Sequence, residues 1–463
     1  MTKSTHNGVR RLLAMLLVLV MALAFLPAGA LAADVTSGTA GSLSWSYDAA
    51  AATLTISGEG AMPDYSTSAS RRSPWGKQSY CDDVTAVIVE DGVTSLGNYA
   101  FYYMEGIKTV TLPDSVTKIG NYAFRNCYGL ETVKLPAKQP TIGTKIFDKC
   151  TKLNNVVIPD GWTSHANSMF SGCTGLADIT LPDSLTTVGS YAFFNTSITE
   201  MSIPESVTEI KGNAFNSCEK LTSVKLPAVM PATLGTYIFY GCTALTSVTI
   251  PDGWTSLPNG MFSGCTALGS VTVPESVTSF GNSVFADCSK LTGPALREGV
   301  TYGTEAYYGT AIASAVIPST MTAIPDSLFE NCAALTSVTM HDGVTAIGSS
   351  AFAGCTALTD VSVPAAVKSI GSYAFDGAAG LKSVVLPKGI ESIGDNACAT
   401  WTAGQTVEVP FRSLADLVDF VDVDPSAFPG EGFAGEVRYT DTSARDVSWC
   451  DFDSAVITDG SVS

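Results

Sequence analysis

The sequence predicts a β-rich solenoid of about fourteen coils, each about 23 residues long. Three observations predict this fold. An aromatic residue recurs at that period, a proline and a glycine keep fixed distances before it, and most copies hold a short run in which apolar and polar residues alternate. One copy is too small to bury its apolar side alone, so the copies must stack on one another.

The recurring aromatic residue sets the register of the array. A proline usually precedes it by eleven residues, a glycine precedes it by four, and an aliphatic residue follows it by six. Most steps are 23 residues, but the step is 22 and then 24 around Phe215, and 21 after Tyr308. We expect these side chains to form a buried ladder through the core. The ladder positions are Phe101, Phe124, Phe147, Phe170, Phe193, Phe215, Phe239, Phe262, Phe285, Tyr308, Phe329, Phe352, Phe375 and finally Cys398.

Within one copy, the pattern predicts a strand, a second apolar pair and a turn. Leu130–Pro136 alternates apolar and polar residues, which is typical of a half-buried strand, and its proline ends the strand. Val116 and Ile119 form the second apolar pair. Gly120 permits a turn that a residue with a Cβ would resist. The stretch NYAFRNC that follows suits a short helical turn that places Phe124 inside.

Nine cysteines follow the aromatic residue by three positions. Other copies have Thr196, Ala311 or Ala378 there, so the slot favours a small buried side chain, and paired zinc-type spacings are absent. Buried free thiols are the favoured interpretation. Disulfides between neighbouring coils stay open as an alternative, and a metal or catalytic role is a remote one. The nine are Cys127, Cys150, Cys173, Cys218, Cys242, Cys265, Cys288, Cys332 and Cys355, whereas Cys81 and Cys450 lie outside the register.

The two ends of the chain differ from the repeats. Residues 1–32 have a basic start, an apolar run at Leu12–Leu26 and an Ala-Leu-Ala site, which is typical of a secretory signal peptide. Residues 33–80 are expected to form an N-terminal cap built on a β-hairpin, with strands near Leu43–Tyr47 and Thr53–Ser57. Residues 81–403 are the solenoid. Residues 404–463 form a C-terminal cap or the start of a further module, with a short helix that begins after Ser413.

The phrase LPDSVTKIGNYAFRNCYGLETV, its many copies and the leading segment TLTISGEGAMPDY…SPWG resemble the BspA-type leucine-rich repeat proteins. The resemblance implies a right-handed, curved leucine-rich repeat array with short parallel strands and short helical turns. It also implies a secreted or cell-surface protein of bacteria or certain protozoa. Some members of that family are adhesins, and the family offers no catalytic residues to carry over.

Charge and composition exclude several classes of function. The formal net charge is −18, and removal of the signal peptide would make it about −21, which argues against nucleic acid or anionic lipid as a partner. No second apolar run of spanning length follows the signal, so the processed chain is expected to have no membrane span. After the signal, the chain has only His165 and His341, without a nucleophile motif or a metal-binding histidine pair. We therefore expect neither an enzyme nor a cofactor.

The remaining function is binding. We expect a monomeric, secreted or cell-surface adhesion module for host or neighbouring-cell proteins or glycans, and the alternative is an architectural spacer without a specific ligand. The outward residues of the strands are mostly small and polar, and they lack the aromatic residues and arginines of strong contact sites. Exposed aromatic side chains are expected on the turns instead. The candidate ligand contacts are Tyr102, Tyr103, Tyr128, Trp162 and Trp254.

Overall fold

The computed structural model describes residues 36–430 and 432–442. The chain divides into two compact units, Met1–Val156 (unit 1) and Val157–Ser463 (unit 2), and each is described by itself. The predicted signal peptide and Cys450 lie outside the described residues.

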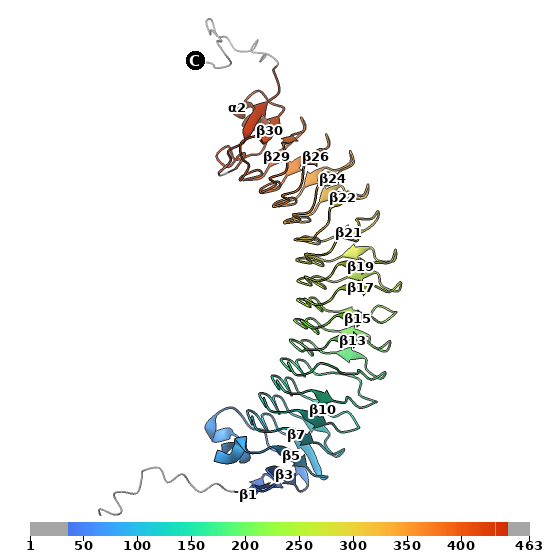
Figure 1. Ribbon diagram of the computed structural model, residues 1–463, viewed down its shortest axis with the longest axis vertical. Coiled ribbons are helices and arrows are strands. Elements are labelled where there is room, and N and C mark those ends of the chain that lie inside the picture. The colour runs from blue at the N-terminus through green and yellow to red at the C-terminus, as the bar shows by residue number, and fades with distance from the viewer. Residues whose placement is uncertain (1–35, 431, 443–463) are drawn as a thin grey trace, which may run out of the picture. The chain divides into compact units, whose positions relative to one another are not determined.

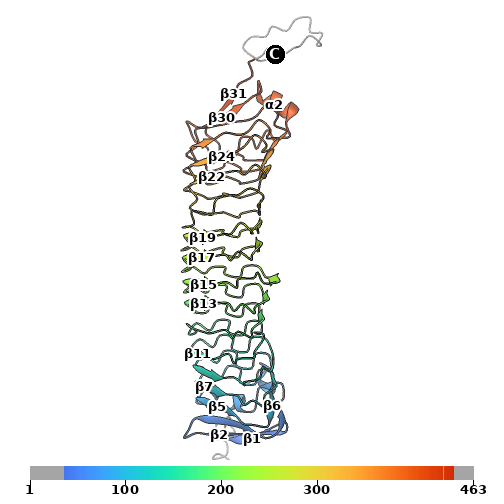
Figure 2. The same ribbon diagram turned by 90° about the vertical axis from the view of Figure 1, so that its right-hand side faces the viewer.

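Unit 1 begins with the hairpin that the sequence predicts. Strand β2 pairs antiparallel with β1 and β3, and β3 then pairs in parallel with β5, the first strand of the repeats (Figure 1, Figure 2). The hairpin therefore covers the strand edge of the first coil. The elements that precede the repeats are β1 (Ser37–Ala40), β2 (Leu43–Asp48), β3 (Thr53–Ser57), β4 (Gly60–Ala61) and the 3₁₀ helices η1 (Ala69–Arg71), η2 (Trp75–Lys77) and η3 (Ser79–Asp82).

The coils of unit 1 form two parallel sheets. Four strands extend the hairpin sheet and keep like residues over like, with Val87 beside Val110 and Val133 beside Val156. A second sheet has the order β10-β8-β6-β4 and is built from shorter strands. The first set is β5 (Ala86–Val89), β7 (Thr109–Thr111), β9 (Thr132–Lys134) and β11 (Asn155–Val156), and the second adds β6 (Val93–Leu96), β8 (Lys118–Ile119) and β10 (Thr141–Ile142).

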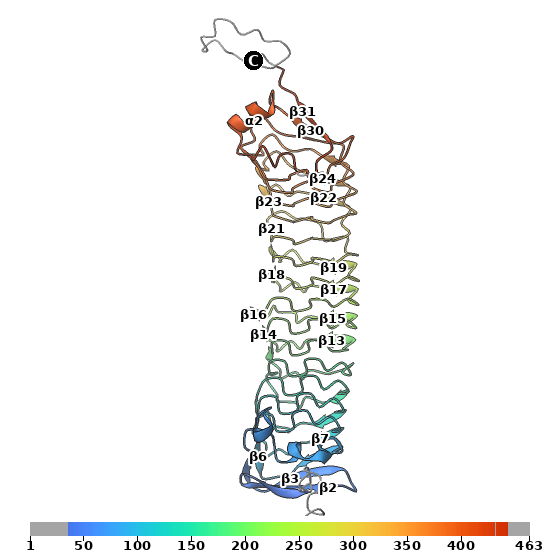
Figure 3. The same cartoon turned by 90° about the vertical axis from the view of Figure 1, so that its left-hand side faces the viewer.

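Unit 2 repeats this arrangement over further coils, again with parallel pairing between equivalent residues (Figure 3). One set of strands is β13 (Glu200–Ser202), β15 (Ser223–Lys225), β17 (Ser247–Thr249), β19 (Ser270–Thr272), β22 (Ser314–Val316), β24 (Ser337–Thr339), β26 (Asp360–Val361) and β28 (Ser383–Val385). The other is β12 (Thr187–Val188), β14 (Glu209–Ile210), β16 (Thr233–Leu234), β18 (Ser256–Leu257), β20 (Ser279–Phe280), β21 (Thr301–Tyr302), β23 (Ala323–Ile324), β25 (Ala346–Ile347), β27 (Ser369–Ile370) and β29 (Ser392–Ile393).

The non-repeating tail of unit 2 continues the strand ladder. β30 (Thr406–Val409) pairs in parallel with β28, and β31 (Glu436–Tyr439) pairs with β30. The predicted helix forms as α2 (Leu414–Phe420), and the hydroxyl of Ser413 accepts a hydrogen bond from the Asp416 amide at 3.2 Å, which caps its start. Among the described residues, no helix is long and apolar enough to cross a membrane.

The aromatic ladder is the core of both units. All twelve ladder phenylalanines are at most 1 % exposed. In unit 1, Phe101 stacks on Phe124 at 4.9 Å between ring centroids, and Trp75 of η2 stacks on the other face of Phe101 at 5.5 Å. In unit 2 the stacked pairs repeat, as at 5.3 Å for Phe215 and Phe239. Burial of each ring contributes about 1.5–3 kcal/mol before conformational entropy is subtracted.

One ladder position predicted from the sequence is wrong. The buried aromatic residue of its coil is Tyr307, which is 0 % exposed and stacks on Phe329 at 6.1 Å, whereas Tyr308 points outward. The steps on either side of this coil are therefore 22 residues each, which is also the step from Phe193 to Phe215. The slot three residues later is then Thr310 and not Ala311.

The predicted helical turns form single turns closed by hydrogen bonds between residues three apart, as from the Arg125 amide to the Tyr122 carbonyl at 3.2 Å. The backbone of these turns differs from that of a helix at two positions. In nearly every coil, the residues two before and two after the ladder position have a left-handed backbone, as Tyr99 (φ 55°) and Tyr103 (φ 62°) do around Phe101. This explains why glycine and asparagine are common at the second position.

The repeated glycine has a different role from the one predicted. Gly120 does not have a left-handed backbone, so the turn does not require it. A Cβ at this position would lie 2.5 Å from the Asn98 amide nitrogen of the preceding coil. Glycine is needed here because the backbones of neighbouring coils approach too closely for a side chain.

Candidate binding surface

The nine register cysteines are buried core residues. All are 0 % exposed, and none of them is joined in a disulfide. Burial raises the pKa of Cys127 to about 12 and that of Cys218 to about 11, so these thiols stay protonated. Eight thiols donate to the carbonyl oxygen of the ladder residue one coil earlier, as Cys127 does to Phe101 at 3.1 Å. A small filler that also donates a hydrogen bond explains the slot better than size alone.

Of the exceptions in this slot, Ala378 is a buried filler without a donor, whereas the threonines and the last copy supply one. Thr196 and Thr310 occupy it in the 22-residue coils, and each hydroxyl donates to the ladder carbonyl of its own coil. Each hydroxyl also lies 3.3 Å from the thiol of the next coil. In the last copy, Trp401 takes the slot and its Nε1 donates to the Phe375 carbonyl at 2.8 Å. None of these side chains is available to a ligand.

The expectation that Trp162 and Trp254 lie exposed on turns is wrong. Both side chains are 0 % exposed. Each stands eight residues before the ladder phenylalanine, which is the slot that Val116 fills in its own copy, so each indole packs into the aliphatic core. The Nε1 of Trp254 donates to the Pro227 carbonyl at 2.9 Å, which satisfies its polar atom. The sequence contained this signal, because the valine slot is recognisable in the neighbouring copies.

The two described histidines are placed by the repeat. His165 is 4 % exposed, and its ring packs edge-on against the rings of Phe170 and Phe193. Neither ring nitrogen has a hydrogen-bond partner among the described residues. Burial lowers its pKa to about 4, so it is neutral at physiological pH. The ring of His341 contacts the Met321 carbonyl at 3.1 Å and accepts from the Gly343 amide at 3.0 Å. His165 is thus enclosed in the core, whereas His341 is partly exposed and both of its ring nitrogens contact backbone atoms.

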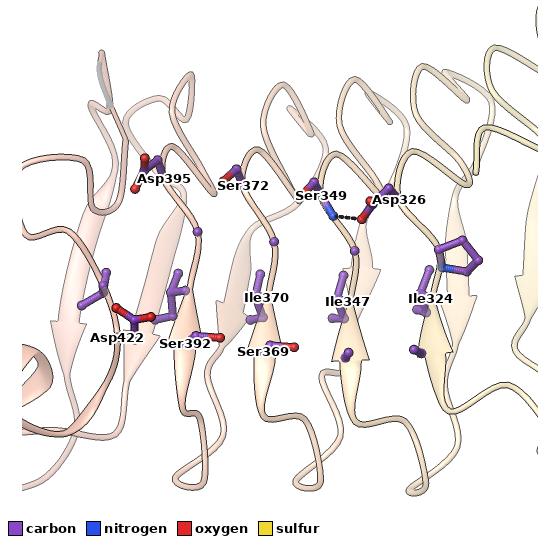
Figure 4. Close-up of a pocket in the computed structure, with 18 of the residues that line it drawn as sticks. Ile324, Asp326, Ile347, Ser349, Ser369, Ile370, Ser372, Ser392, Asp395 and Asp422 are labelled. Carbon is purple, nitrogen blue, oxygen red and sulfur yellow. Dashed lines mark hydrogen bonds between the residues drawn. The ribbon is translucent and has the colours of Figure 1, made fainter. Parts of the chain in front are cut away.

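The strand faces of unit 2 hold two shallow grooves. One, of 810 Å³, runs over β23, β25, β27 and β29, and its floor is formed by small residues such as Ser369 and Ser392 (Figure 4). Asp326 and Asp395 lie on the turns beyond the strands, and Asp422 lies beside Ser392 at one end of the row. The Asp326 carboxylate accepts from the Ser349 amide at 2.7 Å. A second groove, of 540 Å³, crosses β13 and β15. Among the described residues, no three acidic, histidine or cysteine side chains are arranged to hold a metal ion.

The turns of unit 1 carry exposed aromatic side chains close together. Tyr103 is 41 % exposed, and Tyr102 and Tyr128 are half-buried beside it. The Tyr103 ring lies 5.9 Å from Tyr102 and 5.8 Å from Tyr128, so the structure brings together the three tyrosines predicted from the sequence. It also adds two that sequence reasoning missed. Tyr99 contacts Tyr102 at 5.5 Å and stacks on Tyr122 at 4.8 Å.

Arg125 completes this group. Its guanidinium lies 5.5 Å from the centroid of the Tyr122 ring, and its Nε pairs with the Asp148 carboxylate at 2.8 Å. Asp148 is only 4 % exposed, so the pair fixes the arginine against the turns. We call Tyr99, Tyr102, Tyr103, Tyr122, Tyr128 and Arg125 the tyrosine cluster.

The equivalent turns of unit 2 carry isolated aromatic pairs. Tyr191 contacts Phe194 at 5.7 Å, and Tyr237 contacts Tyr240 at 5.9 Å. The coil between them has Asn213 and Asn216 at these positions, which separates the pairs. The tyrosine cluster of unit 1 is thus the larger group of half-exposed aromatic rings on the described turns.

Comparison with solved structures agrees with this architecture. A leucine-rich repeat protein from Bacteroides ovatus is 24 % identical over 83 % of this chain and 98 % of its own, with a TM-score of 0.56. A leucine rich cell surface protein from Faecalibacterium prausnitzii is 29 % identical over 75 % of this chain and 93 % of its own, with a TM-score of 0.42. Comparison with curated proteins gives no match.

The family model for the BspA type leucine-rich repeat region, which describes six copies, matches residues 78–198, 186–302 and 300–416. The matched segments cover the coils of both units, including the ladder residues, the buried thiols and the tyrosine-bearing turns. More than half of the chain is matched. The chain belongs to the BspA-type leucine-rich repeat family.

Proposed function

We propose that this chain is a non-catalytic binding module, secreted or held at a cell surface, that contacts an extracellular protein or glycan through the tyrosine cluster of unit 1. The observation that carries the proposal is the exposure of neighbouring tyrosines on rigid turns. Tyrosine and arginine are enriched at contact sites between macromolecules. Tyrosine supplies a large contact area at a small cost in side-chain entropy.

The backbone at the cluster supports a role beyond stability. Tyr99, Tyr103 and Tyr122 all have φ between 55° and 62°, a region that a bulky side chain rarely adopts. The position of Tyr103 is glycine or asparagine in most other coils. The left-handed backbone itself belongs to nearly every coil, and tyrosine also precedes the ladder ring at Tyr191, Tyr237 and Tyr373, so only the bulky ring at Tyr103 departs from the repeat and indicates a functional constraint.

The cellular location rests on two supports. The basic and apolar pattern of residues 1–32 is typical of a signal for export. The similar protein from Faecalibacterium prausnitzii is described as a leucine rich cell surface protein. An architectural spacer is the second candidate, because the strand faces bear mostly small polar side chains, as in the Ser-Val-Thr strands β17 and β24.

An array of extracellular matrix proteins, mucins and glycans tests the proposal. The protein without its predicted signal peptide would be compared with a variant carrying Tyr102→Ala, Tyr103→Asn and Tyr128→Ala. We expect at least one ligand whose binding weakens about tenfold or more in this variant. A variant with Tyr237→Ala and Tyr240→Ala, which alters an aromatic pair of unit 2, is the matched control and should keep binding. A complete absence of ligands that depend on the cluster would favour the spacer.

A further inference from the structure

The coil that follows the tyrosine cluster places basic side chains next to it. Backbone hydrogen bonds join the two turns, from the Tyr122 amide to the Thr144 carbonyl at 3.0 Å and from the Asn126 amide to the Asp148 carbonyl at 2.9 Å. Lys145 therefore continues the row of Tyr99 and Tyr122, and Lys149 continues the row of Tyr103 and Asn126. Lys152 follows Thr151, whose hydroxyl contacts the Tyr128 carbonyl at 3.4 Å.

These three lysines carry charge that the described residues do not neutralise. Lys149 and Lys152 are exposed and Lys145 is half-exposed, and none of the three forms an ion pair in the part of the chain that the structure describes. The buried Asp148 is already held by Arg125. Glu105 acts electrostatically on the Tyr128 ring, and the Asp82 carboxylate accepts from the Glu105 amide at 3.4 Å, so four basic and three acidic side chains leave a net charge of +1.

This local charge contrasts with the rest of the molecule. Residues 36–156 contain 11 basic and 11 acidic residues, whereas residues 157–442 contain 10 basic and 27 acidic residues, a net charge of −17. A positive patch on an otherwise acidic chain attracts negative partners to one place and repels them elsewhere.

We propose that the tyrosine cluster together with Lys145, Lys149 and Lys152, here the turn-edge patch, binds an acidic segment of a partner protein. This inference rests on the proposed function and names the chemistry of the ligand. The rings supply apolar contact area, Arg125 is fixed in place by Asp148, and the unpaired lysines meet the partner's carboxylates.

A protein segment fits this patch better than a long polyanion does. Tyrosine, asparagine and glycine are among the residues that antibody paratopes use to recognise proteins, and these turns contain them, as in NYAFYY and NYAFRNCYG. A long sulfated polysaccharide would also extend beyond the few coils of the patch, where the acidic remainder of the chain disfavours it.

Selection from a library of displayed random peptides, with the full chain after its predicted signal peptide as the target, tests the inference. We expect selected peptides to be enriched in Asp and Glu and to contain an aromatic or aliphatic residue. Their affinity should fall about tenfold in a Lys145→Gln, Lys149→Gln, Lys152→Gln variant. Their affinity for the unchanged protein should also fall as salt is raised from about 0.15 M to about 1 M, because salt screens the lysine charges. Lys220→Gln, Lys382→Gln, Lys388→Gln is the matched control, because these three lysines are also exposed and form no ion pair among the described residues.

The outcomes separate this inference from the proposed function. Peptides that lose affinity in Tyr103→Asn but are not acidic, and that bind the lysine variant normally, would overturn the acidic partner and leave the binding module standing. Heparin that binds at the lysines while no acidic peptide is selected would also overturn the inference, in favour of a sulfated glycan. Failure to select any peptide that depends on Tyr103 would count against both proposals.

Discussion

Units 1 and 2 have the same interior and different surfaces. In both units, phenylalanine rings of neighbouring coils stack, at 4.9 Å between the centroids of Phe101 and Phe124 and 5.3 Å between those of Phe215 and Phe239. In both, buried thiols donate to the ladder carbonyls, as Cys127 and Cys242 do. Outside the core, the described part of unit 1 has no net charge and carries the tyrosine cluster, whereas residues 157–442 carry a charge of −17 and only separated aromatic pairs. The repeat therefore fixes the slots that stack and leaves the flanking turn positions free to vary.

This comparison predicts that the ladder contributes equally in the two units. Phe124→Ala in unit 1 and Phe239→Ala in unit 2 should each lower the free energy of unfolding by about 3–5 kcal/mol, because both rings are fully buried between two others. Phe101→Ala should cost as much, since Trp75 and Phe124 stack on its two faces. Urea denaturation measures all three. A much smaller loss at Phe101 would show that the first coil opens separately from the rest of the ladder.

The units should differ in their response to acid. The described part of unit 1 has no histidine, whereas unit 2 buries His165, and this burial lowers its pKa from the ordinary value of about 6.5 to about 4. Since the unfolded chain binds the proton more readily, this group leaves stability unchanged above pH 6.5 and lowers it progressively as the pH falls toward 4. The loss should approach about 3 kcal/mol at the lower limit.

His165→Leu tests this effect, because most other copies have an aliphatic residue in this slot. The variant should be at least as stable at pH 7 and should lose less stability than the wild type between pH 6.5 and pH 4. His341→Leu is the control, since that ring is partly exposed and has hydrogen-bond partners. Parallel pH profiles of wild type and His165→Leu would contradict the prediction.

The stacking order could be predicted from the sequence because each core slot repeats many times. The hairpin at Leu43–Asp48 and Thr53–Ser57, the cap at Ser413 and the buried phenylalanines all follow from patterns of spacing. The error at Tyr308 arose because two tyrosines are adjacent in a short copy, so the sequence alone did not distinguish the inward from the outward ring. The left-handed turn positions were missed, although the glycines and asparagines two residues after the rings were a visible signal.

The candidate site was harder to predict than the core, for a physical reason. A surface residue is constrained by its neighbours in space, and the row from Tyr99 to Tyr122 joins residues 23 positions apart. Tyr102, Tyr103 and Tyr128 were expected on the turns and lie there. Trp162 and Trp254 were expected to be exposed because of their type, but the register assigned them to a buried slot. Register was the better guide than residue type.

A smaller effect is expected where the core slot is filled by cysteine. Cys242→Ala removes the donor to the Phe215 carbonyl at 3.3 Å, and Cys127→Ala removes the donor to Phe101 at 3.1 Å. Each should lower the free energy of unfolding by about 1 kcal/mol, equally in the two units, because the site is buried and the carbonyl loses a partner. The native thiols should also react slowly with a thiol reagent, since burial raises their pKa. A large decrease in the free energy of unfolding when reductant is added to the wild type would instead indicate disulfides between coils.

The smallest effect on stability is expected at Tyr103, where the two units differ most. Tyr103→Asn relieves a left-handed backbone at φ 62°, which asparagine adopts more easily, and this should stabilise the fold by about 0.5–1 kcal/mol. The same change removes the ring contact with Tyr128 at 5.8 Å, which costs about 0.5–1.5 kcal/mol, so the two effects nearly offset each other. Tyr102→Asn is the matched control, because Tyr102 has a ring in the same group but no left-handed backbone, so this change should only lower the stability of the fold.

Thermal unfolding measures both variants. A melting temperature of Tyr103→Asn close to that of the wild type, together with weakened ligand binding, would mean that the ring is kept for contact with a partner. A loss of stability at Tyr103 as large as that at Phe124 would instead make the cluster an extension of the core, and the distinction between a shared interior and a variable surface would not hold at this edge.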